Sequence, residues 1–328
     1  MSPPPPPLGR SRRRGGRSEH SFDPALDDSE LIEVRAQFEQ GRWIRARTLL
    51  AATGTDWDRR GHRVVTLAAA PSALCWAEDW LIAEPESADA ATLLACAAVA
   101  RALRPKASPG PAVRAREACL AAARLAPADP TPWLALLMYD GARGSQGEDG
   151  AAEEAARHFE EIRARHPEHH HAHHLMTAQL AESHPESGQD PLHEVYDFAS
   201  WAAEQAPADS PLAVLPVVAH AERYRVLVAA GSEPDDPLTS GHWSGRRARQ
   251  VMKAAFDWWL EWERDDHPRH RVDLNFLAHA KWCQGRPAEA AALFHRIGPH
   301  VTPAPWSYSG RDPYPEFLAA RRFALGAP

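Results

Sequence analysis

A pattern of small and apolar residues recurs at a constant step of forty residues in the middle of this 328-residue chain. Three successive units fill the same four positions, with Gly110, Ala115, Cys119 and Pro127, then Gly150, Ala155, Phe159 and Pro167, then Asp190, Val195, Ala199 and Pro207. Self-similarity at a fixed period of this length indicates a stack of similar structural units. The pattern constrains the architecture of the chain, and it carries no chemistry.

Apolar residues elsewhere recur at helical spacing, and proline and glycine separate the helical runs. Asp27, with Glu30 three residues later, has the pattern of a capping box, so we expect it to cap the first helix. Pro216 lies inside the helix that begins at Pro211, and we expect it to kink that helix or end it early. No alternating apolar and polar run is long enough for a strand, so the predicted fold class is all-α.

Composition divides the chain into four parts. Residues 1–26 hold five consecutive prolines and then five arginines, and we expect a disordered tail because so little apolar surface can be buried. Residues 27–230 hold the N-terminal helices and the forty-residue repeats. Residues 231–241 have the composition of a linker, and residues 242–328 form a tryptophan-rich helical unit that completes the array.

The overall charge and the cysteines exclude several classes of protein. A net charge of −7 gives no general attraction to nucleic acid or to an anionic membrane. The four cysteines match no zinc or redox spacing. The sequence has no secretory signal and no apolar stretch of about 18 residues, so we expect a cytoplasmic protein without a membrane partner.

The predicted helix pairs resemble the tetratricopeptide repeat. The unit after Pro268 matches best, and the residues at the offsets of that family are Leu274, Leu277, Ala278, Gly285, Ala290 and Phe294. The resemblance covers about residues 27–300, with a step of forty residues where the family has thirty-four. It implies an α-solenoid of antiparallel helix pairs, and its groove positions correspond to Asn275 and His279.

Such an array implies a non-enzymatic scaffold that binds a protein or peptide on its concave face. Asn275 and His279 are then adjacent and suited to hold a peptide backbone or a carboxylate. The alternative is a regulatory or sensor module that binds a small molecule between Trp258, Trp262 and Trp282 of the C-terminal unit. Packing of these residues in the core or at the end of the array is equally compatible with the sequence.

Histidines are concentrated in one short run, made of His166, His169, His170, His171, His173 and His174. On a helix, His170 and His174 are four residues apart, so their imidazoles can face one metal ion. A metal site needs a third or fourth ligand, and Glu168 is the only acidic residue near the run. We therefore expect a polar first turn of a helix with adventitious nickel or zinc affinity, and no physiological metal or other cofactor.

Motifs of known enzyme classes are missing from the sequence. It has no nucleophile elbow, no zinc-protease helix, no dinucleotide-binding loop and no Walker-type loop. Asp265, Asp266, His267 and Asp273 lie close together in sequence, but the polar boundary of a helix explains them equally well. We therefore expect no enzymatic activity.

Overall fold

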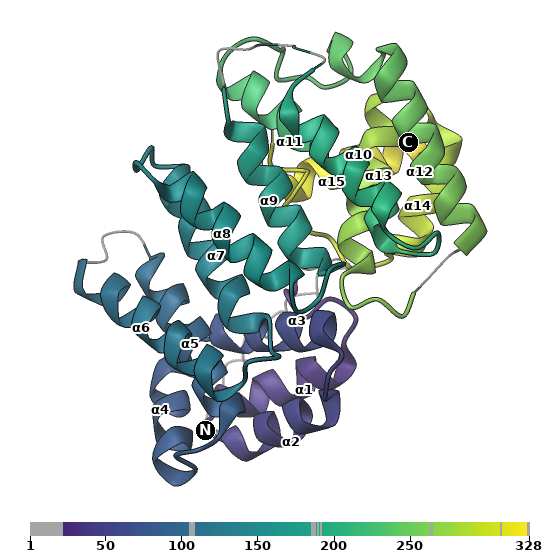
Figure 1. The fold of residues 1–328 in the computed structure, drawn as a ribbon. Helices are drawn as coiled ribbons and strands as arrows, with labels where there is room; N and C mark the ends of the chain where they lie inside the picture. The colour runs from purple at the N-terminus through teal and green to yellow at the C-terminus, as the bar shows by residue number, and fades with distance from the viewer. Residues whose placement is uncertain are drawn as a thin grey trace, which may run out of the picture.

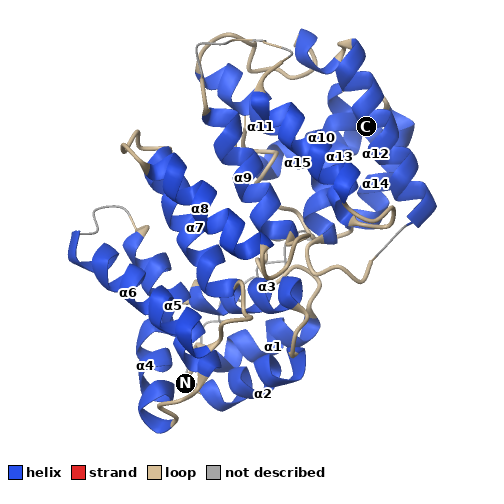
Figure 2. Ribbon diagram, in the orientation of Figure 1, coloured by secondary structure: helices blue, strands red, loops and turns tan. Residues whose placement is uncertain are grey.

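The structure is a computed structural model, and it describes residues 22–104, 109–184, 188, 190, 192–262, 265–308 and 310–326. These residues form fifteen α-helices and two short 3₁₀ helices without a β-strand, which confirms the all-α prediction (Figure 2). No helix among them combines the length and the apolar character that crossing a bilayer requires. Most of the predicted N-terminal tail, residues 1–21, lies outside the described residues. Residues 22–26 pack against the fold, with Ala25 and Leu26 buried.

The helices follow one another with short connections. The first group comprises α1 (Ser29–Phe38), α2 (Trp43–Thr53), α3 (Trp57–Ala68), α4 (Ala73–Ala83), α5 (Ala88–Ala102) and α6 (Pro109–Leu125). The middle group comprises α7 (Thr131–Gly144), α8 (Ala151–Arg163), α9 (His170–Glu182) and α10 (Glu194–Gln205). The last group comprises α11 (Leu215–Ala229), α12 (Arg246–Trp262), α13 (His270–Cys283), α14 (Pro287–Ile297) and α15 (Pro313–Leu325). Many consecutive helices pack against each other, including α5 with α6, α7 with α8 and α13 with α14.

The forty-residue step corresponds to three helices of the structure, α6, α8 and α10. The second repeated position is buried in each of them, at Ala115, Ala155 and Val195. The third position is buried in each as well, although its side chain changes from Cys119 to Phe159 to Ala199. The period therefore reports equivalent core-facing positions on three successive helices, each of which contacts the helices beside it.

Two local predictions have different outcomes. The cap of α1 is Asp28, whose carboxylate accepts a hydrogen bond from the Leu31 backbone N–H at 2.9 Å, so the prediction of Asp27 is wrong by one residue. The prediction for Pro216 is confirmed. A 3₁₀ helix over Pro211–Val214 ends there, and α11 restarts at Leu215, which places Pro216 in a first turn where its missing N–H needs no partner.

Two large hydrophobic cores organise the helices. One lies among α1 to α7 and the other among α9 to α15, while a small cluster from α7, α8 and α9 lies between them. Figure 1 shows the same division, with the purple and blue helices in one group and the green and yellow helices in the other. The predicted linker 231–241 does not separate two cores, because the second core includes residues on both sides of it. The N-terminal ends of α3, α9 and α13 lie close together between the two cores, and polar side chains are concentrated there.

Candidate functional sites

Asn275 and His279 lie in the interior of the protein. Asn275 is fully buried, and its amide nitrogen donates to the carbonyl oxygens of Arg271 at 2.8 Å and His300 at 3.0 Å. Its amide oxygen accepts a hydrogen bond from the Trp306 indole nitrogen at 2.8 Å. His279 is 4% exposed and packs against the same indole ring. The predicted open groove therefore does not run over these two positions, because the loop that follows α14 covers them.

The three tryptophans of the alternative prediction have different surroundings. The Trp258 indole is half-buried and donates to the carbonyl oxygen of Ala208 at 2.8 Å. Trp262 is 41% exposed at the end of α12. Trp282 is buried, and its ring packs against Trp306. These contacts indicate packing roles for Trp258 and Trp282.

An open hollow of about 700 Å³ lies in the same part of the molecule, between α12 and the turn from α13 to α14. We call it the α12–α14 hollow, and its aromatic and basic lining residues are Trp243, Phe256, Arg249, Lys253, Lys281 and Arg286. Lys281 is almost fully buried, with its ammonium 4.6 Å from the centre of the Phe256 ring and 2.5 Å from a carboxylate oxygen of Glu289. Aromatic and basic side chains therefore line this hollow together.

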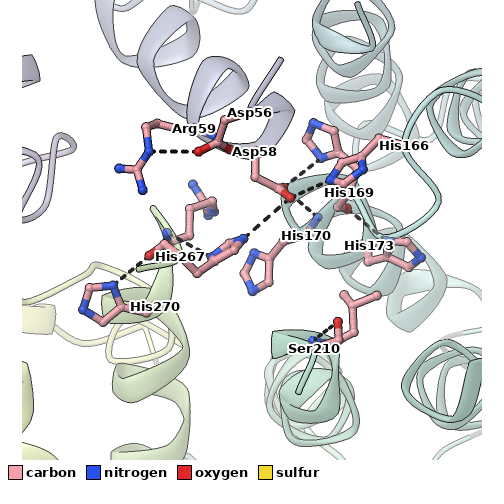
Figure 3. Close-up of polar contacts among 12 residues, drawn as sticks. Asp56, Asp58, Arg59, His166, His169, His170, His173, Ser210, His267 and His270 are labelled. Atoms are coloured by element: carbon pink, nitrogen blue, oxygen red, sulfur yellow. Dashed lines mark hydrogen bonds and ion pairs between the residues drawn. The ribbon is translucent and has the colours of Figure 1, made fainter. Parts of the chain in front are cut away.

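A second site lies where two turns of the same sequence pattern, His-Pro-x-His, lead into α9 and α13. His166 and His169 form the ends of one turn, and His267 and His270 form the ends of the other. In both turns the backbone N–H of the second histidine donates to the carbonyl oxygen of the first at 3.1 Å. Figure 3 shows the two turns on either side of Asp58, which lies in the first turn of α3.

Asp58 accepts hydrogen bonds from the first of these turns and from the start of α9, and it lies near the second turn. One carboxylate oxygen accepts from the His166 imidazole at 2.8 Å, and the other accepts from the backbone N–H of His170 at 2.9 Å (Figure 3). The His267 Nε2 atom lies 3.7 Å from the carboxylate, which is longer than a hydrogen bond. Burial alone raises the pKa of Asp58, but the contacts with the imidazoles outweigh it and keep that pKa well below its usual range. The carboxylate likewise raises the pKa of His166 against the effect of burial.

Behind this turn, His170, His174 and Asp273 form a compact buried cluster. The His170 Nε2 atom lies 2.9 Å from one oxygen of Asp273, and the His174 Nε2 atom lies 3.2 Å from the other. The three side chains are between 1% and 9% exposed. One nitrogen from each imidazole and one carboxylate oxygen all lie within 4.8 Å of one another. The i, i+4 histidine pair of the sequence therefore meets a third potential ligand from a helix about one hundred residues later.

The protonation states in this cluster follow from burial. Burial lowers the pKa of His170 to about 3, so its imidazole is neutral near pH 7. Burial also acts to raise the pKa of Asp273, but the contacts with His170 and His174 hold it below its usual range. Asp273 is therefore an ionised carboxylate in the interior. Among the described residues, its side-chain ion-pair partners are these two imidazoles, and no arginine or lysine joins them.

A smaller hollow of about 270 Å³ opens beside the cluster. We call it the acidic hollow, because its lining includes five carboxylates, from Asp56, Asp58, Glu168, Asp209 and Asp266. His267 also lines it, and its ring centre lies 4.4 Å from that of His170. His267 thus contacts both the hollow and the cluster behind it.

Further polar contacts join distant parts of the chain around this junction. Arg59 of α3 donates to the backbone carbonyl oxygen of Asp266 at 2.6 Å. Asp27 lies 3.2 Å from the imidazole of His270 and 2.9 Å from the guanidinium of Arg271. The residue predicted to cap the first helix therefore binds α13 instead. The junction is assembled from the N-terminal helices, the histidine run and the start of α13.

The histidine run itself is buried. The sequence predicted a polar first turn of a helix, and in the structure the run's residues in α9, His170, His171, His173 and His174, are at most 8% exposed. The sequence argument missed Asp58, His267 and Asp273 as partners of the run. The one signal that pointed to them is the second His-Pro-x-His pattern, which precedes Asp273 by a few residues.

Comparisons with other proteins add no assignment to these sites. No protein-family model, no curated protein and no solved structure matches the chain. The tetratricopeptide resemblance therefore stays a prediction from the repeat pattern, and function has to be inferred from the geometry described above.

Proposed function

We propose that this protein is a non-enzymatic scaffold of stacked helix pairs that binds an acidic segment of a partner protein in the α12–α14 hollow. The observation that carries the proposal is the hollow itself, which is open to solvent and is lined by aromatic and basic side chains. Aromatic residues and arginine are the side chains that protein interfaces prefer. Stacked helix pairs, as in the tetratricopeptide resemblance, supply the rigid support for such a surface.

The charges of the α12–α14 hollow favour an acidic ligand. Its four cationic residues face two carboxylates in the lining, Asp257 and Glu289. Lys253 forms an ion pair with Asp257, and Lys281 forms one with Glu289, so Arg249 and Arg286 supply the excess positive charge. Complementary charge raises association rates and selects partners. An acidic peptide that also has an apolar side chain, which would pack on the aromatic lining residues, fits this hollow.

Binding of fluorescent acidic peptides tests the proposal. The variant Arg249→Glu/Arg286→Glu reverses the excess charge of the hollow, and Arg322→Glu changes an exposed arginine of α15 as a control. We expect the double variant to bind roughly tenfold or more weakly and the control to bind like the wild type. If no acidic peptide binds the wild type, or if the double variant binds equally well, the proposal is wrong.

A second candidate function uses the same hollow for a small molecule, because its volume of about 700 Å³ lies within the range of ligand pockets. This replaces the predicted pocket between the three tryptophans. A thermal-shift screen with small carboxylates and phosphates tests it. Stabilisation of the wild type that is lost in Arg249→Glu/Arg286→Glu supports this candidate, and the lack of any stabilising compound counts against it.

A further inference from the structure

The atoms of His170, His174 and Asp273 already have the spacing of ligands on one metal ion. Ligand atoms of a tetrahedral zinc ion, at about 2 Å from the metal, lie about 3.3 Å from one another. The Oδ1 atom of Asp273 lies 3.0 Å from the His170 Nε2 atom and 3.2 Å from the His174 Nε2 atom, and both distances are close to that value. The two imidazole rings are 4.2 Å apart at their centres, near enough to share an ion. The three side chains come from α9 and α13, which are rigid elements, so the set is preorganised.

The carboxylate of Asp273 is buried between two imidazoles, and the buried guanidinium of Arg269 also interacts with it electrostatically. An ionised carboxylate in the interior is costly unless it is paired, and the contacts of Asp273 are two imidazoles. Each of these contacts requires a proton on the imidazole Nε2 atom when no ion is present. A divalent cation would use the same two Nε2 atoms as ligands once the proton of each neutral imidazole has moved to Nδ1, and its charge would balance that of the carboxylate.

We propose that His170, His174 and Asp273 bind one divalent transition-metal ion, and that zinc is the ion this set suits. Two imidazoles and a carboxylate without a thiolate are a ligand set found on zinc. Copper and nickel prefer more ligands in a square or octahedral arrangement, which three clustered atoms do not provide. The site goes beyond the proposed binding of an acidic segment, and neither depends on the other.

The fourth coordination position belongs to water, because His267 is not arranged as a ligand. Its Nδ1 atom accepts a hydrogen bond from the backbone N–H of Arg269 at 3.2 Å. A neutral imidazole with that acceptor carries its proton on Nε2, and a protonated nitrogen cannot ligate a metal. The His267 ring lies against that of His170, and its Nε2 atom is 3.7 Å from the Asp58 carboxylate.

The acidic hollow provides the route by which the ion enters. Five carboxylates line its opening, of which Asp56 pairs with Arg59 and Asp58 with His166, and acidic groups at an opening raise the local concentration of cations. His267 lies between this opening and the cluster, so its side chain has to move aside for the ion to pass. An entry path of this kind is what a buried metal site needs.

The ion would link two helices of the second hydrophobic core. It joins α9 to α13 directly, and Asp58 connects α9 to α3 through the backbone of His170. Ligands from different parts of the chain come together only in the folded protein, so the free energy of metal binding stabilises the fold. The role inferred for the ion is therefore structural.

Zinc titration of the full-length chain without a histidine tag tests this site, in competition with a chromophoric chelator. The variants are His174→Ala and Asp273→Asn, of which the second keeps the shape of the side chain. The matched control is His173→Ala, since His173 lies on the same helix and is equally buried but packs against Phe159. Circular dichroism of each variant establishes that it is folded. Cobalt substitution reports the geometry through its visible absorption.

We expect one zinc ion per chain with a dissociation constant of roughly 1 µM or lower in the wild type and in His173→Ala. His174→Ala and Asp273→Asn should weaken binding by about 100-fold or more. The cobalt protein should show the intense absorption of a four-coordinate ion. The proposal is overturned if the wild type binds no zinc in competition with the chelator. Equal affinity in the wild type and Asp273→Asn also overturns it, because binding then involves surface histidines only.

Discussion

Replacement of Asn275 by alanine should destabilise the protein by about 2 to 4 kcal/mol. The change removes two donated hydrogen bonds, to Arg271 and His300. It also removes two accepted bonds, from the Trp306 indole and the Thr302 backbone N–H. The Trp306 indole N–H is then left buried without a partner, which alone costs about 1 to 3 kcal/mol. The lost packing of a fully buried side chain adds to this. A groove residue exposed to a ligand would instead change binding and leave stability within about 0.5 kcal/mol of the wild type.

Urea unfolding of wild type, Asn275→Ala, Trp306→Phe and the double variant measures this effect. Trp306→Phe keeps an aromatic ring but removes the N–H. The four proteins form a double-mutant cycle that isolates the Asn275–Trp306 hydrogen bond, and we expect an interaction free energy of about 1 kcal/mol or more between the two residues. Gln37→Ala is a control, because its amide bonds only to Glu33 on an exposed surface. If Asn275→Ala unfolds at the same urea concentration as the wild type, the assignment of this residue to the interior is wrong.

Two further predictions concern pH and a turn. Burial lowers the pKa of three histidines outside the metal cluster to about 4, 3 and 3, and these are His62, His220 and His279. The unfolded chain binds their protons below pH 6.5 and the folded chain does not, so stability is full above that pH and falls on acidification. Between pH 7 and pH 5, each of these histidines should lower the free energy of unfolding of the protein by about 2 kcal/mol. Urea unfolding at both pH values measures this, and a constant free energy of unfolding would contradict the burial of these histidines. Gly41→Ala should cost about 1 to 3 kcal/mol, because Gly41 has φ +82° and a Cβ atom would lie 2.9 Å from the Trp76 ring. Gly147→Ala is its control, with a similar φ and nothing nearby, and an equal loss in both would exclude the contact with Trp76.

The helical content could be predicted from the sequence because its causes are local. The forty-residue step identified equivalent buried positions on α6, α8 and α10, and Pro216 marked the start of α11. Local patterns place a helix boundary only within a residue or two. That margin explains the error at the first helix, where Asp27 and Asp28 are both suitable caps. Tertiary contacts decide between them, since Asp27 is bound to α13.

The groove residues could not be placed from the sequence for a different reason. The assignment of Asn275 and His279 to a groove, taken from the tetratricopeptide resemblance, assumes that no later segment of the chain covers the concave face of the helix array. Here the segment after α14 returns over α13, and Trp306 packs on His279 while bonding to Asn275. That segment has no helical pattern, so its path depends on the cavity it fills. The same polar side chain that a groove would present to a ligand instead holds this loop.

The partners of the histidine run could not be predicted from the sequence, because they lie far from the run along the chain. A helix with polar residues all round is expected at the surface, unless other parts of the chain supply its hydrogen bonds. In α9 the histidines are buried because α3 supplies Asp58 and α13 supplies Asp273, each about one hundred residues away. The sequence contained one usable sign of this, the His-Pro-x-His turn that precedes both α9 and α13. Each turn leads into its helix near Asp58, and the first turns of α9 and α13 come close enough for Asp273 to contact the His170/His174 pair.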